Sequence, residues 1–168
     1  MTAARPVLFL DVDGPLLPFG AGTTPPAPDT VGTGNPLLSR LRPELGPRLL
    51  SLGCDLVWAT TWLDEANEVL APRLGLPELP VVRWAEDAGV RGPRGLRWKT
   101  AELVAWAGAR PFLWVDDEIG PMDRLWVEAQ HPGPALLHRV DPGRGLADAD
   151  FTALARFTAG LRRSGRRA

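Results

Sequence analysis

The sequence is poor in several features that would point to other classes of protein. Cys54 is the only cysteine, so no disulfide can form within the chain. No apolar run approaches the roughly 20 residues that a membrane-spanning helix needs. The formal net charge is -1, so no overall basic field favours a nucleic-acid partner. These absences exclude a disulfide scaffold and a membrane span, and we expect a cytoplasmic protein.

The length and the position of the basic residues suggest one domain with a short tail. The chain has 168 residues, which suits a single domain around one sizeable core. We expect that domain to span residues 1–161. The arginine-rich residues 162–168 are expected to form a solvated, disordered C-terminal tail, with a weak contact to a polyanion as the alternative.

Short, continuous apolar segments alternate along the chain with segments of helical periodicity. Five of them predict buried strands, at residues 7–12, 55–60, 81–84, 111–116 and 135–140. Helical patterns lie between and after them, at residues 36–50, 63–74, 100–106, 123–130 and 148–161. Such alternation is typical of βαβ units. It predicts an α/β protein with a three-layer, Rossmann-like fold, in which helices cover both faces of a mainly parallel five-stranded sheet.

Prolines and glycines mark where some of these elements are interrupted. Pro43 and Pro47 are expected to break or kink the helical pattern of residues 36–50, and Gly75 is expected to end the next helix. Residues 15–35 are rich in glycine, proline and threonine and have no helical period. Because a connection of this length is more often functional than accidental, we expect these residues to form a flap.

Three of the predicted strands end in polar side chains. The pairs are Asp11 and Asp13 after the first strand, Thr60 and Thr61 after the second, and Asp116 and Asp117 after the fourth. In an open α/β sheet, ligands bind outside the carboxyl ends of the strands, so these side chains are expected to meet at one edge. Converging carboxylates repel one another and require either raised pKa values or a cation. Oxygen ligands without cysteine or histidine favour a hard ion such as Mg²⁺.

The basic residues are almost all arginine. Lys99 is the only lysine among the 19 basic residues. An ammonium group is a compact point charge on a flexible stem, whereas a guanidinium is a planar fork. A functional ammonium at this place would explain the exception, and the alternative is a surface lysine at the start of a helix that Trp98 or Lys99 begins.

In their order along the chain, these motifs resemble the haloacid dehalogenase (HAD) superfamily. They are an Asp-x-Asp-Gly segment, a threonine after a second strand, a later lysine and an Asp-Asp pair: Asp11, Asp13, Gly14, Thr60, Lys99, Asp116 and Asp117. The resemblance covers roughly residues 7 to 140. It implies a Mg²⁺-dependent phosphatase that forms an aspartyl-phosphate.

The resemblance implies a role for each polar side chain. Asp11 would attack phosphorus, and Asp13 would protonate the leaving oxygen and then help to activate the hydrolytic water. Thr60 would hydrogen-bond the phosphoryl oxygens, with Thr61 as the neighbouring candidate. Lys99 would neutralise both Asp11 and the transferring phosphate.

The resemblance also implies a Mg²⁺ site at the strand ends. Its ligands would be Asp11, the backbone carbonyl of Asp13, and Asp116, with Asp117 as a further ligand or an orienting residue. Gly14 would let the backbone turn where the phosphate approaches closely. An Asp-Gly pair alone would predict only a turn, so the metal site is inferred from all four motifs together.

The segments between the motifs hold no spare domain that could cap the site. Residues 15–54 contain the flap and one helix, and residues 62–98 contain a helix and a short strand. In the HAD superfamily, members that act on small metabolites usually carry a cap, so its absence suits a large substrate or a phosphate at a chain end. Specificity would then depend on the flap and on the 85–96 loop, which carries Arg91 and Arg94.

A narrower resemblance concerns four segments of the chain. These segments, LFLDVDG, VWATTW, WVDDE and HRVDPGRGL, are similar to those of capless HAD members associated with RNA-repair proteins. This would imply a phosphatase that acts on nucleic-acid ends. The net charge of -1 does not favour such a partner, although local arginine patches could suffice. The expected partner is therefore a phosphorylated small molecule or a macromolecular chain end.

Some side chains, and the function itself, have more than one interpretation. Trp62 and Trp98 flank the second and third motifs, where an aromatic ring could stack on a base or form the wall of the site. His131 and His138 show no ligand spacing and are expected to be structural or exposed to solvent. The alternative to an enzyme is a binding module that holds a phosphorylated partner in the same cleft. A receiver domain is disfavoured because its phosphoacceptor follows a middle strand.

Overall fold

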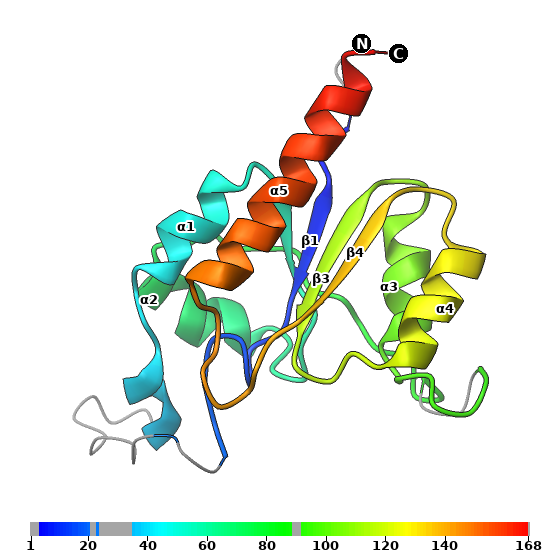
Figure 1. Cartoon of the computed structure of the whole chain (residues 1–168). Helices are drawn as coiled ribbons and strands as arrows, with labels where there is room; N and C mark the ends of the chain where they lie inside the picture. The colour runs from blue at the N-terminus through cyan, green and yellow to red at the C-terminus, as the bar shows by residue number, and fades with distance from the viewer. Residues whose placement is uncertain (1–3, 21–22, 24–34, 89–91, 168) are drawn as a thin grey trace.

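The protein is built on a four-stranded, all-parallel β-sheet (Figure 1). The computed structural model describes residues 4–20, 23, 35–88 and 92–167. The strands are β1 (Val7–Leu10), β2 (Asp55–Trp58), β3 (Phe112–Asp116) and β4 (Ala135–Arg139), and their order in the sheet is β2-β1-β3-β4. The predicted α/β class and parallel sheet are thus confirmed, with β1 in the interior of the sheet.

The prediction of a fifth strand at residues 81–84 is wrong. Val81 forms only an isolated parallel bridge with Trp58, and the described residues contain four strands. The Trp58 N–H donates to the carbonyl of Pro80 at 2.9 Å, and the Val82 N–H donates to the carbonyl of Trp58 at 2.9 Å. The chain then leaves the sheet edge, because the indole of Trp84 bonds instead to the carbonyl of Thr60 at 3.0 Å.

Helices cover both faces of the sheet, as the sequence predicts. They are α1 (Leu45–Ser51), α2 (Ala71–Leu74), α3 (Thr100–Ala107), α4 (Pro121–Gln130) and α5 (Asp148–Gly165). In Figure 1, α1, α2 and α5 lie on one side of the sheet and α3 and α4 on the other. The described residues between the strands include no separate cap domain.

The two faces of the sheet bury two separate hydrophobic clusters. Along β1, Leu8 and Leu10 belong to the cluster that includes residues of α1, α2 and α5, whereas Val7 and Phe9 belong to the cluster with residues of α3 and α4. All four β1 side chains are fully buried. This double burial explains why the strand is apolar throughout instead of alternating with polar residues.

Proline shapes the helices on the α1–α2 face. The pattern of residues 36–50 divides into the 3-10 helix η1 (Pro36–Arg40) and α1, so the predicted break is confirmed at Pro43, whereas Pro47 lies within the first turn of α1 and does not interrupt it. The predicted helix of residues 63–74 is a π-helix, η2 (Ala66–Leu70), that continues as α2. Pro72 cannot donate a backbone hydrogen bond, and the preceding Ala71 N–H donates to the carbonyl of Ala66. Gly75 ends α2 in the left-handed conformation with φ 66°, as predicted.

Two predicted surface segments need comment. Most of the expected flap, residues 21–22 and 24–34, lies outside the described residues, as does Arg91. At the other end of the chain, α5 continues through Gly165, so the first residues of the basic segment are helical. Arg162 donates to the carbonyl of Leu52 at 3.1 Å, which attaches this part of α5 to the end of α1. None of the helices in the described ranges is long and apolar enough to cross a membrane.

Candidate active site

The loop after β1 carries Asp11 and Asp13 and is held in place by backbone hydrogen bonds. The Asp11 N–H donates to Val115 of β3 at 3.1 Å, so the sheet ladder fixes the start of the loop. Gly14 has φ 99°, a conformation that L side chains rarely adopt. A Cβ at Gly14 would also lie 2.9 Å from the Cβ of Asp117. Glycine therefore allows this loop to approach the end of β3 closely.

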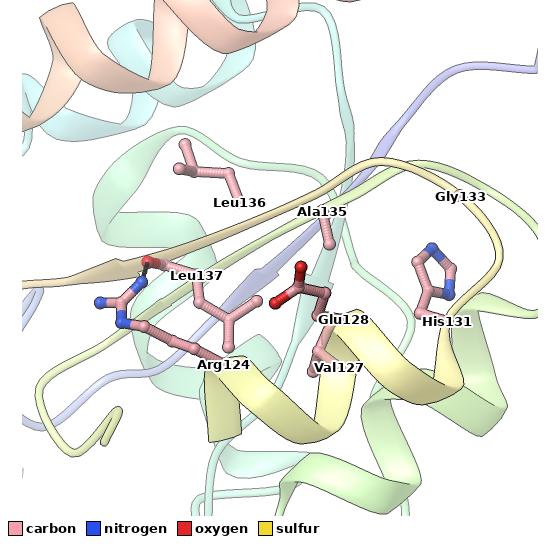
Figure 2. A pocket seen from close by; sticks show the side chains of 8 residues that line it. All are labelled: Arg124, Val127, Glu128, His131, Gly133, Ala135, Leu136 and Leu137. Carbon is pink, nitrogen blue, oxygen red and sulfur yellow. Dashed lines mark hydrogen bonds between the residues drawn. The ribbon is translucent and has the colours of Figure 1, made fainter. Parts of the chain in front are cut away.

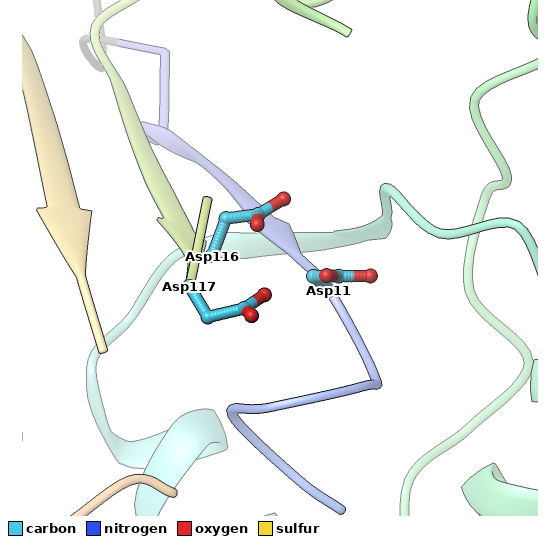
Figure 3. A group of neighbouring side chains, drawn as sticks. All are labelled: Asp11, Asp116 and Asp117. Atoms are coloured by element: carbon cyan, nitrogen blue, oxygen red, sulfur yellow. The ribbon is translucent and has the colours of Figure 1, made fainter. Parts of the chain in front are cut away.

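Three carboxylates converge where β1 and β3 end. One oxygen from each of Asp11, Asp116 and Asp117 lies within 4.8 Å of the others. Figure 3 shows Asp11 after β1 and the other two at the end of β3, with their carboxylates grouped together. The predicted convergence is confirmed for these three residues, whereas the side chain of Asp13 is not part of the group. An all-oxygen cluster of this kind could hold a metal ion and suits a hard cation.

Lys99 lies beside this cluster and is almost completely buried, with 7% of its surface exposed. Its Nζ lies 3.2 Å from Oδ1 of Asp11 and 2.8 Å from Oδ2 of Asp116, and it donates to the carbonyl of Ala59 at 3.0 Å. Three short contacts around one nitrogen match the three donors of an ammonium group. The single lysine is thus a buried counter-charge at the N-cap of α3, and the alternative of a surface lysine is wrong.

The pKa values reflect an excess of negative charge in the cluster. Burial raises the pKa of Asp11 to about 7, because the lowering effect of Lys99 does not fully offset burial and the nearby Asp116 carboxylate. Burial, together with the charge of Asp116, raises the pKa of Asp117 to about 6. Burial lowers the pKa of Lys99, but Asp11 and Asp116 outweigh it and hold this pKa above its usual range. One ammonium, in contact with two of the three clustered carboxylates, leaves an excess of negative charge that a further cation could balance.

Asp116 is the most heavily supported of the three carboxylates. Besides the contact with Lys99, its Oδ2 accepts a hydrogen bond from the indole of Trp114 at 3.3 Å. Its Oδ1 accepts from the backbone N–H of Glu118 at 2.9 Å. These donors fix the orientation of the carboxylate, as the surroundings of metal ligands commonly do.

The two threonines after β2 differ in their surroundings. Thr60 is fully buried, and its hydroxyl oxygen accepts from the backbone N–H of Trp62 at 3.2 Å. Thr61 is exposed. The hydroxyl of Thr60 is therefore fixed in direction, while that of Thr61 is free to face solvent.

Two residues support the site in ways that the sequence did not indicate: Trp62 was expected beside the site without its hydrogen-bond partner, and Asp123 was not expected in the site. The indole Nε1 of Trp62 donates to Oδ2 of Asp13 at 3.2 Å. Asp123 is fully buried in the first turn of α4 and accepts from Arg97 N at 2.8 Å and from the Thr100 hydroxyl at 2.6 Å. Asp123 thereby ties α4 to the residues on either side of Lys99. The sequence analysis identified Asp123 only as a charge near a helix N-terminus.

Residues 7–151 match the family model described as the HAD domain in Swiss Army Knife RNA repair proteins. The chain belongs to this family. No curated protein and no solved structure matches it. Both resemblances drawn from the motifs, to the HAD superfamily and to its capless members associated with RNA repair, are thus confirmed. The carboxylate cluster is consistent with the metal site expected of a HAD domain.

A separate pocket shares no lining residue with the carboxylate cluster. It has a volume of about 370 Å³ and lies between α4 and β4 (Figure 2). It is lined by Arg124, Val127, Glu128, His131, Gly133, Ala135, Leu136 and Leu137.

His131 is buried and its ring packs edge-on against Phe112 at 4.7 Å, while His138 bonds to Asp150 at 2.7 Å. Both histidines therefore have structural surroundings, in line with the prediction from spacing.

The raised pKa values predict that metal binding depends on pH. Between about pH 4 and pH 7, folded Asp11 keeps a proton that the unfolded chain has released, so the metal-free protein loses stability as pH rises through this range. A cation must displace this proton, and the proton on Asp117 below about pH 6. Apparent affinity for a divalent cation should therefore fall about tenfold per pH unit between about pH 7 and pH 6, and more steeply below about pH 6, where two protons are displaced.

The shift in melting temperature on adding Mg²⁺ measures this dependence. We expect a larger rise at about pH 8 than at about pH 5.5, with EDTA-treated protein as the reference at each pH. An equal rise at both values would contradict proton displacement from the cluster.

Proposed function

We propose that this HAD domain is a Mg²⁺-dependent phosphohydrolase that forms a phosphorylated Asp11. The observation that carries the proposal is the buried cluster of Asp11, Asp116 and Asp117 with Lys99 against two of its members. When bound, Mg²⁺ would be held by these carboxylates and the Asp13 carbonyl, and would stabilise negative charge on the phosphoryl oxygens.

The residues of the chain would divide the remaining work. Lys99 keeps Asp11 oriented and adds positive charge beside the transferring group, and the hydroxyl of Thr60 binds a phosphoryl oxygen. Asp13 protonates the leaving oxygen and later accepts a proton from the attacking water. Its side chain is available for this role because it lies outside the carboxylate cluster.

We propose further that the substrate is a phosphate at a nucleic-acid end. The family description names RNA repair proteins, and the described residues form no cap domain over the site. A terminal phosphate could then enter the open edge of the sheet while the rest of the strand stays outside. Exposed Arg139, whose Nε donates to the carbonyl of Asp117 at 3.0 Å, and exposed Arg94 of the 85–96 loop could contact the flanking phosphates.

A substrate panel tests this proposal. Oligonucleotides with a 3′- or 5′-phosphate should be hydrolysed with a kcat/KM at least about tenfold above the values for sugar phosphates, nucleotides and phosphopeptides. Activity on small phosphates alone would contradict the nucleic-acid substrate. If the metal-replete protein binds phosphorylated ligands and hydrolyses none, the domain is a binding module.

A further inference from the structure

Within the described part of the chain, the indole of Trp62 donates the only hydrogen bond from another side chain to the carboxylate of Asp13. Its Nε1 donates to Oδ2 of Asp13 at 3.2 Å, although the two residues are 49 positions apart. The ring is partly buried and packs against the hydrophobic cluster on the α1–α2 face. Packing therefore holds the ring in a position where its N–H meets the carboxylate, and the ring is part of the wall of the site.

The backbone around Trp62 is also held in an unusual conformation. Its own N–H donates to the hydroxyl of Thr60 at 3.2 Å. The next residue, Leu63, has φ 51° and is the one non-glycine residue in the described ranges with positive φ. Strained backbone of this kind persists where the surroundings over-determine it, and it is common at functional sites. One residue thus contacts the side chains of both Asp13 and Thr60.

An indole nitrogen is a donor only, and this restricts what Asp13 can do. The oxygen that faces Nε1 must act as an acceptor whether or not the carboxyl group is protonated. We infer that Trp62 is a positioning residue that reserves Oδ2 of Asp13 as an acceptor, so that Oδ1 carries the proton exchanged with leaving group and water. The inference rests on the proposed phosphohydrolase function.

Both half-reactions use the same oxygen in this scheme. In the first, a carboxylate oxygen of Asp11 bonds to phosphorus, the bond from phosphorus to the leaving oxygen breaks, and that oxygen takes the proton from Oδ1. In the second, water bonds to phosphorus, its proton passes to Oδ1, and the bond between phosphorus and Asp11 breaks to release phosphate. Asp13 ends protonated and ready for the next turnover.

The dependence on the leaving group tests the inference. Trp62→Phe keeps an aromatic ring and removes the N–H donor. An alkyl phosphate needs protonation of its leaving oxygen far more than p-nitrophenyl phosphate does. We expect Trp62→Phe to lower kcat/KM for the alkyl phosphate by about 10- to 100-fold and for p-nitrophenyl phosphate by less than about threefold. The larger loss is a part of the roughly 10²- to 10⁴-fold that general acid catalysis contributes, because Asp13 itself remains.

Trp98→Phe is the matched control. Trp98 is also partly buried near the site, where its ring packs on Trp84 at 4.8 Å and lies 5.5 Å from Nζ of Lys99. Trp98→Phe should change kcat/KM for the two substrates by the same factor. Both variants should keep the wild-type melting temperature and its rise on adding Mg²⁺. Equal losses for the two substrates with Trp62→Phe, or no loss, would overturn the inference alone. Absence of turnover by the wild-type protein would overturn the proposed function and the inference together.

Discussion

Replacing Asp11 by asparagine is expected to lower the turnover of any phosphate monoester by at least about 10³-fold, because the amide cannot act as the nucleophile. The change conserves size at a site that is 7% exposed. It also removes one of the three clustered negative charges. The fold should therefore survive, while Mg²⁺ binding weakens. Steady-state assays with and without EDTA, together with thermal unfolding, measure the two effects separately.

Asp55→Asn is a suitable control for this experiment. Asp55 begins β2 and therefore lies at the amino ends of the parallel strands, away from the carboxylate cluster. It pairs with Arg5 and Arg110 on the surface. Its replacement is expected to leave turnover and Mg²⁺ dependence unchanged. If Asp11→Asn retained the activity of the wild-type protein, an aspartyl-phosphate on Asp11 would be ruled out.

Replacing Lys99 by methionine is expected to have the largest effect on stability. The variant fills a similar volume but leaves Asp11 and Asp116 without their shared cation, at 7% and 1% exposure. Loss of one partner from a buried ion pair typically costs about 3–5 kcal/mol. Urea unfolding at neutral pH measures this loss. Saturating Mg²⁺ should restore part of it, because the ion supplies positive charge to the same carboxylates. Turnover should fall as well, since Lys99 faces the proposed nucleophile.

Two further variants make the Lys99 experiment specific. Lys99→Arg keeps the charge, but a planar guanidinium cannot reproduce three short contacts that converge on one nitrogen. It should restore only part of the stability and little of the activity. Arg83→Met removes an ion pair with Asp64 that is exposed on both sides, and should have little effect. If Lys99→Met unfolded at the same midpoint urea concentration as the wild-type protein, a structural role for the buried ammonium would be contradicted.

The fold shows where reasoning from local patterns succeeds. The four observed strands all lie within predicted segments. The reason is clearest for β1 and β3, because a strand buried on both faces must be continuously apolar and this can be seen in the sequence. The predicted strand at residues 81–84 has a similar composition, but only Val81 pairs with β2, through a single bridge to Trp58. Whether an apolar segment pairs along its length depends on how the chain enters and leaves the sheet, which no local pattern records.

The candidate site likewise contains some residues that local patterns identify and others that they miss. Asp11, Asp116 and Thr60 could be identified because each directly follows or ends an apolar strand, and the carboxyl ends of parallel strands share one edge. The roles of Trp62 and Asp123 could not be identified in this way. Trp62 bonds to a residue 49 positions away, and Asp123 bonds to Thr100, 23 positions away. Such contacts depend on how loops pack against one another.

The sequence by itself determined the class of fold, the family and the cluster of acidic residues, because these depend on apolar periodicity and on the residues at strand ends. Only the tertiary structure decided that Lys99 is buried between two carboxylates, that Thr60 is buried and Thr61 exposed, and that Trp62 holds Asp13. The physical reason is that burial, charge compensation and hydrogen-bond direction arise from side chains that meet only when distant segments pack together.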